Sequence, residues 1–311
     1  FQYMRILIRG LLAFMLLSPV LQGQKPAIAE ADLPKLKEWE DTISLLSFAI
    51  INDSFPENRF GATKKMIPTL VQALKTPNSF QYPFSRAQSI SIQYPEDSTF
   101  RVFTWQLYVD VDEYRYFGAI QMNTGELQLF PLIDRSFDVE EVEYEVLPAD
   151  KWYGALYYGV KSFDTPQGKK YLLFGYDAFS FFNKRKVIDV LSFPDGKPQF
   201  GAPVFFNEEK EGGVKVRNRL LFEYTAEASV KCNYDPLMEM VVVDHLVEVG
   251  GFYEGQGATK IPDGSYEGYQ LVDGIWKNIS MLENTIMDEP PRPFPVLDGD
   301  DGVDILGRKK Q

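Results

Sequence analysis

The sequence predicts a mainly β protein of the α+β class, with an N-terminal helical pair followed by a large antiparallel β meander of about a dozen strands. Two observations carry this prediction. Between residues 32 and 75, apolar side chains recur every three or four positions, which is the period of an amphipathic helix. After residue 89, runs rich in β-branched and aromatic residues alternate with turn sequences. The pattern leaves three arrangements open for the strands: sandwich, barrel or propeller-like.

Residues 1–23 are predicted to be a signal peptide with a few upstream residues. Two arginines precede an apolar run of 11 residues, Leu11 to Leu21, which is shorter than the roughly 20 residues of a membrane-spanning helix. We expect cleavage near Gly23 and no lipid anchor, because Gln24 stands where a lipoprotein carries cysteine. The predicted location is the periplasm or the extracellular space, with no membrane span in the mature chain.

Residues 24–88 form the predicted N-terminal helical segment. Asp32 is placed to cap the first helix, and Pro34 suits its first turn. The first helix carries one apolar stripe, which we expect to pack in the core: Leu36, Trp39, Ile43, Leu46 and Ile50. A second helix, interrupted by Pro68, is predicted from a second apolar set: Met66, Val71 and Leu74.

Residues 89–287 form the predicted antiparallel β domain. Asn-Thr-Gly, Pro-Asp-Gly and Val-Asp-Gly separate β-rich runs, and glycine accepts the positive φ that tight hairpin turns need. The strands fall into three groups, around residues 90–132, 152–206 and 217–279, which is compatible with blades or stacked meanders. A plain meander bent into a sandwich or barrel explains the same grouping.

Residues 288–311 are predicted to be a loosely packed tail rich in proline, glycine and acidic residues. Its run Asp-Gly-Asp-Asp-Gly-Val-Asp, residues 298–304, has the oxygen ligands that calcium prefers. The run does not match an EF-hand loop, because Val303 takes the glycine position. We therefore expect an acidic tail and no metal site.

The charge balance bears on the partners of the protein. The formal net charge is −12 and becomes −14 once the two leader arginines are removed. Such a chain repels phosphate-bearing partners, so we expect neither nucleic acid nor anionic lipid to be bound.

Cysteine and histidine are too few for several common chemistries. Cys232 is the only cysteine, so it has no disulfide partner within the chain and is expected to pack as a small apolar residue. His245 is the only histidine, which disfavours zinc and serine-triad enzymes. We expect it to be a hydrogen-bonded structural residue on an apolar strand face, and we expect no cofactor.

Three carboxylates interrupt apolar strands and are candidate catalytic residues: Asp177, Glu223 and Asp244. A carboxylate is expensive to bury, so each either faces water, pairs with a cation or serves a site. Two of them across a cleft would suffice for glycoside hydrolysis. The alternative is that all three lie on a solvated sheet face.

The chain has 24 Phe, 17 Tyr and 4 Trp, a content that favours either aromatic core packing or a sugar-stacking platform. For the platform, we select five candidate ligand-binding residues: Trp105, Trp152, Tyr157, Tyr158 and Tyr176.

Several blocks of sequence together resemble a family of uncharacterised secreted or envelope proteins of Bacteroidota-type bacteria. The blocks are PNSFQYPF (77–84), FRVFTWQ (100–106), YFGAIQ (116–121), WYGALYY (152–158), YLLFGYD (171–177), RKVIDVLSF (185–193), FEYTAEASV (222–230) and YDPLMEMVVVDHL (234–246). The resemblance implies an envelope or extracellular setting and supplies no catalytic residues. The chain departs from the expected Gly-Trp-Asp-Gly at residues 175–178, where it has Gly-Tyr-Asp-Ala.

Together these features predict an exported, non-catalytic binding or structural component of the bacterial envelope or extracellular space. Its expected ligand is a glycan or an envelope protein. The alternative is a carboxylate-dependent glycoside hydrolase that uses the three carboxylates named above.

Overall fold

The computed structural model describes residues 27–208 and 212–279, which form a pair of α-helices and three β-sheets. The fold is mainly β with an N-terminal helical pair, as predicted. The predicted signal peptide (1–23), the tail (288–311) and its acidic run (298–304) lie outside the described residues.

Helices α2 (Leu33–Asn52) and α3 (Pro56–Leu74) form the helical pair. The predicted apolar stripe of α2 does pack in the core, with Leu36, Ile43 and Ile50 fully buried. Asp32 occupies the predicted N-cap position of α2, but it also ends a short 3-10 turn (Glu30–Asp32) and its side chain makes no capping hydrogen bond. Pro68 lies within α3 without ending it; buried residues on both sides of the proline hold the helix in place.

The first sheet has the order β1-β2-β3-β4, with every pair antiparallel. Its strands are β1 (Ser91–Gln93), β2 (Phe100–Asp110), β3 (Glu113–Met122) and β4 (Leu129–Ile133). Successive side chains of a strand point to opposite faces. In β2, Phe103, Trp105 and Leu107 therefore pack with the helices, and Phe100 and Val102 pack toward the second sheet.

The second sheet has the order β5-β9-β8-β7-β6, and β12 also pairs with β8. Its strands are β5 (Leu147–Pro148), β6 (Leu156–Thr165), β7 (Gly168–Asp177), β8 (Asn183–Ser192), β9 (Gln199–Phe200) and β12 (Leu220–Thr225). Both faces of this sheet are covered. In β7, Leu173 joins the core shared with the first sheet, whereas Leu172 and Phe174 join the core shared with the third.

The third sheet has the order β11-β10-β16-β15-β14-β13 and is antiparallel except for the parallel pair β10–β16. Its strands are β10 (Phe205–Glu208), β11 (Val214–Arg217), β13 (Cys232–Asp235), β14 (Met240–Gly250), β15 (Ala258–Val272) and β16 (Ile275–Ile279). Cys232 is buried in the core between the second and third sheets, as expected for a packed thiol.

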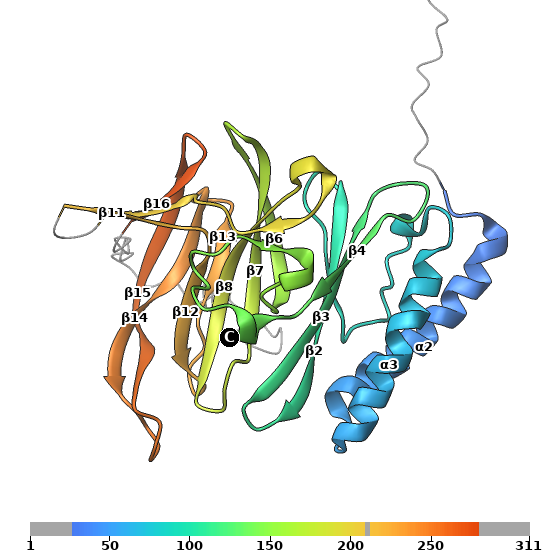
Figure 1. Ribbon diagram of the computed structural model, residues 1–311, viewed down its shortest axis with the longest axis horizontal. Helices are drawn as coiled ribbons and strands as arrows, with labels where there is room; N and C mark the ends of the chain where they lie inside the picture. Colours follow the sequence, from blue (N-terminus) through green and yellow to red (C-terminus); the bar gives the residue numbers. More distant parts are fainter. Residues whose placement is uncertain (1–26, 209–211, 280–311) are drawn as a thin grey trace, which may run out of the picture.

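The helices and the three sheets lie side by side as four layers (Figure 1). Three hydrophobic cores separate the layers, and the sheets do not close into a barrel. Of the arrangements left open by the sequence, the structure therefore adopts the sandwich. The first predicted strand group corresponds to the first sheet. The other two groups do not each form one sheet, because Phe205–Glu208 joins the third sheet and Leu220–Thr225 joins the second.

Two of the three predicted turns, Pro-Asp-Gly (194–196) and Val-Asp-Gly (272–274), have the positive φ angles expected for their glycines, whereas Gly125 of Asn-Thr-Gly does not. Asp273 and Gly274 have φ angles of 53° and 82° between β15 and β16, the two positive values that a type I′ hairpin turn needs. Within residues 27–208 and 212–279, no helix combines the length and apolar character needed to span a membrane.

Candidate functional site

A pocket of about 920 Å³ lies where the first and second sheets meet. Strand β3 contributes Tyr114 and Tyr116, and the end of β7 contributes Asp177. The loop after β4, residues 134–140, forms another wall and carries the exposed side chain of Phe137. Because the walls come from separate layers, the pocket exists only in the assembled sandwich.

Strand register brings two of the predicted carboxylates to the same face of the second sheet. Asp177 of β7 lies opposite Arg185 of β8, and Arg185 in turn lies opposite Glu223 of β12. Residues directly opposite one another share a face, and strands are about 4.8 Å apart. The backbones at Asp177 and Glu223 are therefore about 10 Å apart, with Arg185 between them.

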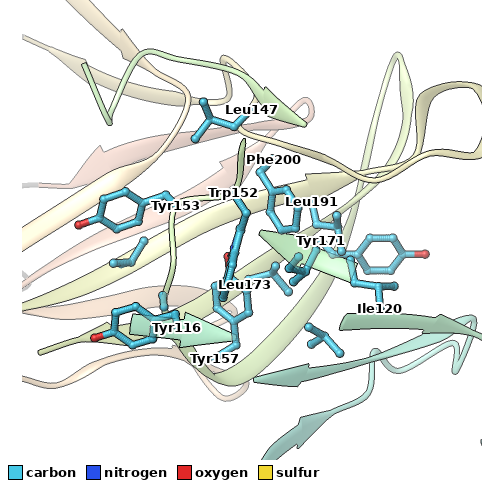
Figure 2. Close-up of a cluster of buried hydrophobic side chains, with 14 of the residues drawn as sticks. Tyr116, Ile120, Leu147, Trp152, Tyr153, Tyr157, Tyr171, Leu173, Leu191 and Phe200 are labelled. Atoms are coloured by element: carbon cyan, nitrogen blue, oxygen red, sulfur yellow. The ribbon is translucent and has the colours of Figure 1, made fainter. Parts of the chain in front are cut away.

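Asp177 is buried, and three hydrogen bonds hold its carboxylate. Its Oδ1 accepts hydrogen bonds from the Tyr116 hydroxyl at 3.0 Å and from the backbone N–H of Phe179 at 2.9 Å. Its Oδ2 accepts from the Tyr153 hydroxyl at 2.7 Å. Figure 2 shows that the hydroxyls of Tyr116 and Tyr153 point to the same side of the aromatic cluster, away from that of Tyr171.

Arg185 extends this network toward Glu223. Its guanidinium donates to the Tyr153 hydroxyl at 3.2 Å and to the carboxylate of Glu223 at 2.9 Å. The guanidinium carbon also lies 3.3 Å from the centre of the Phe179 ring. Hydrogen bonds therefore connect five side chains in a row across the end of the second sheet: Glu223, Arg185, Tyr153, Asp177 and Tyr116.

Burial sets the protonation of this network. The pKa of Asp177 is raised because burial disfavours its charged form, and the hydrogen bonds and Arg185 offset only part of this effect. The pKa values of Tyr116 and Tyr153 are also raised, by burial first and by the nearby Asp177 second. Both tyrosines therefore remain protonated near neutral pH and act as donors to the carboxylate.

The third predicted carboxylate lies elsewhere. Asp244 belongs to β14 of the third sheet and accepts a hydrogen bond from the backbone N–H of Lys231 at 2.7 Å. The structure thus brings together Asp177 and Glu223 but not Asp244. Of the three, only Asp177 lines the pocket.

Three of the predicted aromatic ligand-binding residues are core residues. Trp105 is buried under the helices, where its ring stacks on Phe117 at 5.7 Å. Trp152 and Tyr157 are fully buried between the first and second sheets, and the Trp152 indole N–H donates to the Tyr157 hydroxyl at 2.8 Å. None of these three rings can stack on a sugar, because each is buried in a core between two layers.

Tyr158 and Tyr176 are half-buried and lie outside the pocket. The ammonium of Lys186 lies 4.6 Å from the Tyr158 ring and 5.5 Å from the Tyr176 ring. The Tyr158 hydroxyl donates to the backbone carbonyl of Cys232 at 2.7 Å. The Lys186 contacts lie within the second sheet, and the Tyr158–Cys232 hydrogen bond joins the second sheet to the third.

His245 has the predicted hydrogen bond but not the predicted surroundings. Its Nδ1 lies 2.9 Å from Oδ2 of Asp263, and its side chain is 38% exposed. The prediction that His245 lies on an apolar strand face is wrong. The register of β14 against β15 shifts between Asp244 and Leu246, which interrupts the alternation of side chains at His245.

Sequence reasoning missed several residues of the pocket. Asp134 accepts hydrogen bonds from the backbone N–H of Tyr116 at 2.9 Å and of Ser136 at 3.0 Å. Gly154 allows this approach, because a Cβ there would lie 2.6 Å from Cγ of Asp134. Gly154 in the block WYGALYY is the one sequence signal that could have pointed to this close packing. Phe137 and Asp134 lie in a loop, where strand periodicity gives no information.

Among the described residues, no group of three or more His, Cys, Asp or Glu side chains is arranged to hold a metal ion. Comparisons of the chain with protein-family descriptions, with curated proteins and with solved structures found no match.

Proposed function

We propose that the protein is an exported, non-catalytic binding component of the bacterial envelope or extracellular space, and that the pocket beside Asp177 holds a glycan. The observation that carries this proposal is the combination of an exposed aromatic ring, Phe137, with fixed polar groups in one concave site. Small-ligand sites are commonly concave, with a few well-placed polar groups that fix orientation. The proposed location rests on the leader-like residues 1–23 and on the resemblance of the sequence blocks.

A glycan fits this pocket better than a protein segment does. A sugar presents an apolar ring face, which can stack on Phe137, and hydroxyls that can bond to carboxylates such as Asp134. The pocket volume of about 920 Å³ falls within the range of small-ligand sites. Hydrogen bonds already fix the side chains of Asp134 and Asp177, so ligand binding costs little conformational entropy at these residues.

The geometry of Asp177 favours binding over catalysis. Both of its oxygens already accept hydrogen bonds, and two of the three donors are tyrosine hydroxyls that are themselves buried. A general acid must present its proton to the substrate. In this arrangement Asp177 instead holds the β7–β8 connection and the tyrosines in position.

One observation favours the alternative, a carboxylate-dependent glycoside hydrolase. The pKa of Asp177 is raised by burial, as in the general acids of glycosidases. Against it, Arg185 lies between Asp177 and Glu223 and is bonded to the latter. Reducing ends released from polysaccharides by the wild type, but not by Asp177→Asn or Glu223→Gln, would establish hydrolysis; no release by the wild type would remove this alternative.

A titration with a matched pair of variants tests the binding function. An oligosaccharide that binds the wild type on a glycan array is titrated into Phe137→Ala and into Leu237→Ala. Both side chains are highly exposed, but Leu237 lies on the β13–β14 turn and outside the pocket. We expect affinity to fall about tenfold, or 1.4 kcal/mol, for Phe137→Ala only. Equal affinities of the two variants, or an array with no binder, would contradict the proposal.

A further inference from the structure

The charges that line the pocket are unequal in number. The carboxylates are Asp112, Glu113, Asp134, Glu140 and Asp177, and the guanidiniums are Arg115, Arg135 and Arg185. Low-dielectric walls strengthen such an imbalance, because they focus the field within the pocket. The lining carries an excess of negative charge and therefore attracts cations. The whole chain is also negatively charged, with a formal net charge of −12.

Each arginine of the lining already has a carboxylate partner. Arg115 lies 3.0 Å from Glu113, and Arg185 lies 2.8 Å from Glu223. Arg135 lies 3.8 Å from Asp138. A ligand carboxylate or sulfate would have to displace one of these partners, so the pocket is poorly suited to anionic glycans.

Of the five lining carboxylates, only Glu113 forms an ion pair at 4.0 Å or less within the described ranges. Asp112 accepts a hydrogen bond from the backbone N–H of Phe181, and Asp177 is buried among its tyrosine donors. The remaining two carboxylates, Asp134 and Glu140, lie on either side of Phe137 in the sequence. Asp134 accepts its hydrogen bonds from backbone N–H groups and a hydroxyl, and its oxygens keep further acceptor positions. Lys184 does not line the pocket, and its ammonium donates to the backbone carbonyls of Ala178 and Ser180.

Phe137 supplies an aromatic surface in the same wall of the pocket as Asp134 and Glu140. The guanidinium carbon of Arg135 lies 5.9 Å from the ring centre, and the side chain is 78% exposed. A single guanidinium covers at most one ring face, so the other face remains open to a ligand. Aromatic faces attract ammonium groups as well as apolar ring faces.

We propose that the pocket selects glycans with free amino groups over neutral, N-acetylated or acidic glycans. This inference rests on the proposed glycan-binding function and adds the chemical class of the ligand. An ammonium on the sugar donates to Asp134 and Glu140 while the sugar ring lies on Phe137. Acetylation of the amine removes its charge, and a carboxylate on the sugar meets arginines that are already paired.

Titration calorimetry with four oligosaccharides of similar length tests the selectivity. The probes are β-1,4-linked tetramers of glucose, glucosamine and N-acetylglucosamine, with a tetragalacturonate as the acidic probe. We expect the glucosamine tetramer to bind at least about tenfold more tightly than the other three. The difference should shrink as ionic strength is raised toward about 1 M, where screening extends over only about 3 Å.

Two variants with the same change in charge locate the effect. Glu140→Gln removes a carboxylate of the pocket, and Glu254→Gln removes an exposed one from the β14–β15 turn. We expect Glu140→Gln to weaken glucosamine binding about threefold to tenfold and to leave glucose binding unchanged. Glu254→Gln should bind both sugars as the wild type does.

The outcomes separate this inference from the proposed function. Equal affinity for the glucose, glucosamine and N-acetylglucosamine tetramers overturns the amine selectivity and leaves glycan binding intact. Binding of none of the probes overturns both. Equal losses in Glu140→Gln and Glu254→Gln overturn the selectivity, because the attraction would then come from the net charge. Equally strong competition by tetralysine overturns the assignment to a glycan.

Discussion

Tyr153 donates its hydroxyl proton to the buried carboxylate of Asp177 across 2.7 Å. Removing that donor in Tyr153→Phe leaves a buried carboxylate oxygen without a partner. A hydrogen bond to a buried charged group contributes about 1 to 3 kcal/mol, so we expect a loss of that size in the free energy of unfolding. Urea titration measures it. Tyr144→Phe is the control, because its exposed phenol has no hydrogen bond among the described residues and its removal should change stability by under about 0.5 kcal/mol.

Arg101 is a fully buried cation without a carboxylate partner among the described residues. Its guanidinium donates to the backbone carbonyls of Ser79 and Tyr82, to the Tyr94 hydroxyl and to the Gln121 side chain. It also lies 4.7 Å from the centre of the Phe103 ring. The residue thereby fastens the segment after α3 to the face of the first sheet.

The planar guanidinium cannot be replaced by an ammonium at this position. Arg101→Lys leaves buried acceptors without donors, so we expect the free energy of unfolding to fall by about 2 to 4 kcal/mol. Arg115→Lys, at a half-exposed arginine of β3, should change it by under about 0.5 kcal/mol. Chemical denaturation of both variants measures the difference, and equal effects would show that the buried network contributes little.

Glu40 makes stability depend on pH in the acid range. Burial raises its pKa, but hydrogen bonds from Tyr82 and Arg86 outweigh this effect and hold the pKa below its ordinary value of 4.5. A carboxyl whose pKa is lower in the folded state contributes stability above its unfolded pKa. That contribution is lost as the pH falls through the folded-state value.

We therefore expect the stability difference between the wild type and Glu40→Gln to be largest near neutral pH and to shrink below about pH 4.5. Thermal or urea unfolding at a series of pH values measures it. A difference for Glu40→Gln that does not vary with pH would contradict the role of its carboxylate.

The pKa of Asp177 is raised in the folded state, so its protonation stabilises the folded chain as the pH falls. We therefore expect the free energy of unfolding of the wild type to increase relative to that of Asp177→Asn as the pH is lowered.

Cys232 is expected to be inert in the folded protein. It is buried between the second and third sheets, and burial raises its pKa to about 12, so the reactive thiolate is scarce at neutral pH. A thiol reagent should label the native chain slowly and the urea-unfolded chain at once. Rapid labelling of the native chain would show that the core around Cys232 opens readily.

The helices and turns could be predicted because their signals are local. The stripe from Leu36 to Ile50 repeats at the helical period, and Asp273-Gly274 carries the turn chemistry of a hairpin. The number of layers could not be predicted. In the run YLLFGY, residues 171–176, alternate side chains enter two different cores, so the sequence reads as continuously apolar and does not reveal its neighbours.

The site could be predicted only in part for the same physical reason. Asp177 and Glu223 stood out as carboxylates in apolar strands, but their link through Arg185 depends on the register of three strands. The sequence left Trp152 and Tyr157 open between core packing and a sugar-stacking platform, and only the covering sheet makes them core residues. The loop that carries Asp134 and Phe137 has no periodic pattern that could have identified it.

Hydrogen–deuterium exchange with and without a saturating glycan tests the location of the binding site most directly. We expect slower exchange in the segments 132–140 and 177–179, which contribute most of their residues to the pocket beside Asp177, and unchanged exchange in the β13–β14 turn. Protection confined to another pocket, lined by residues that include 166–171 and 201–204, would place the ligand elsewhere and contradict the proposed site.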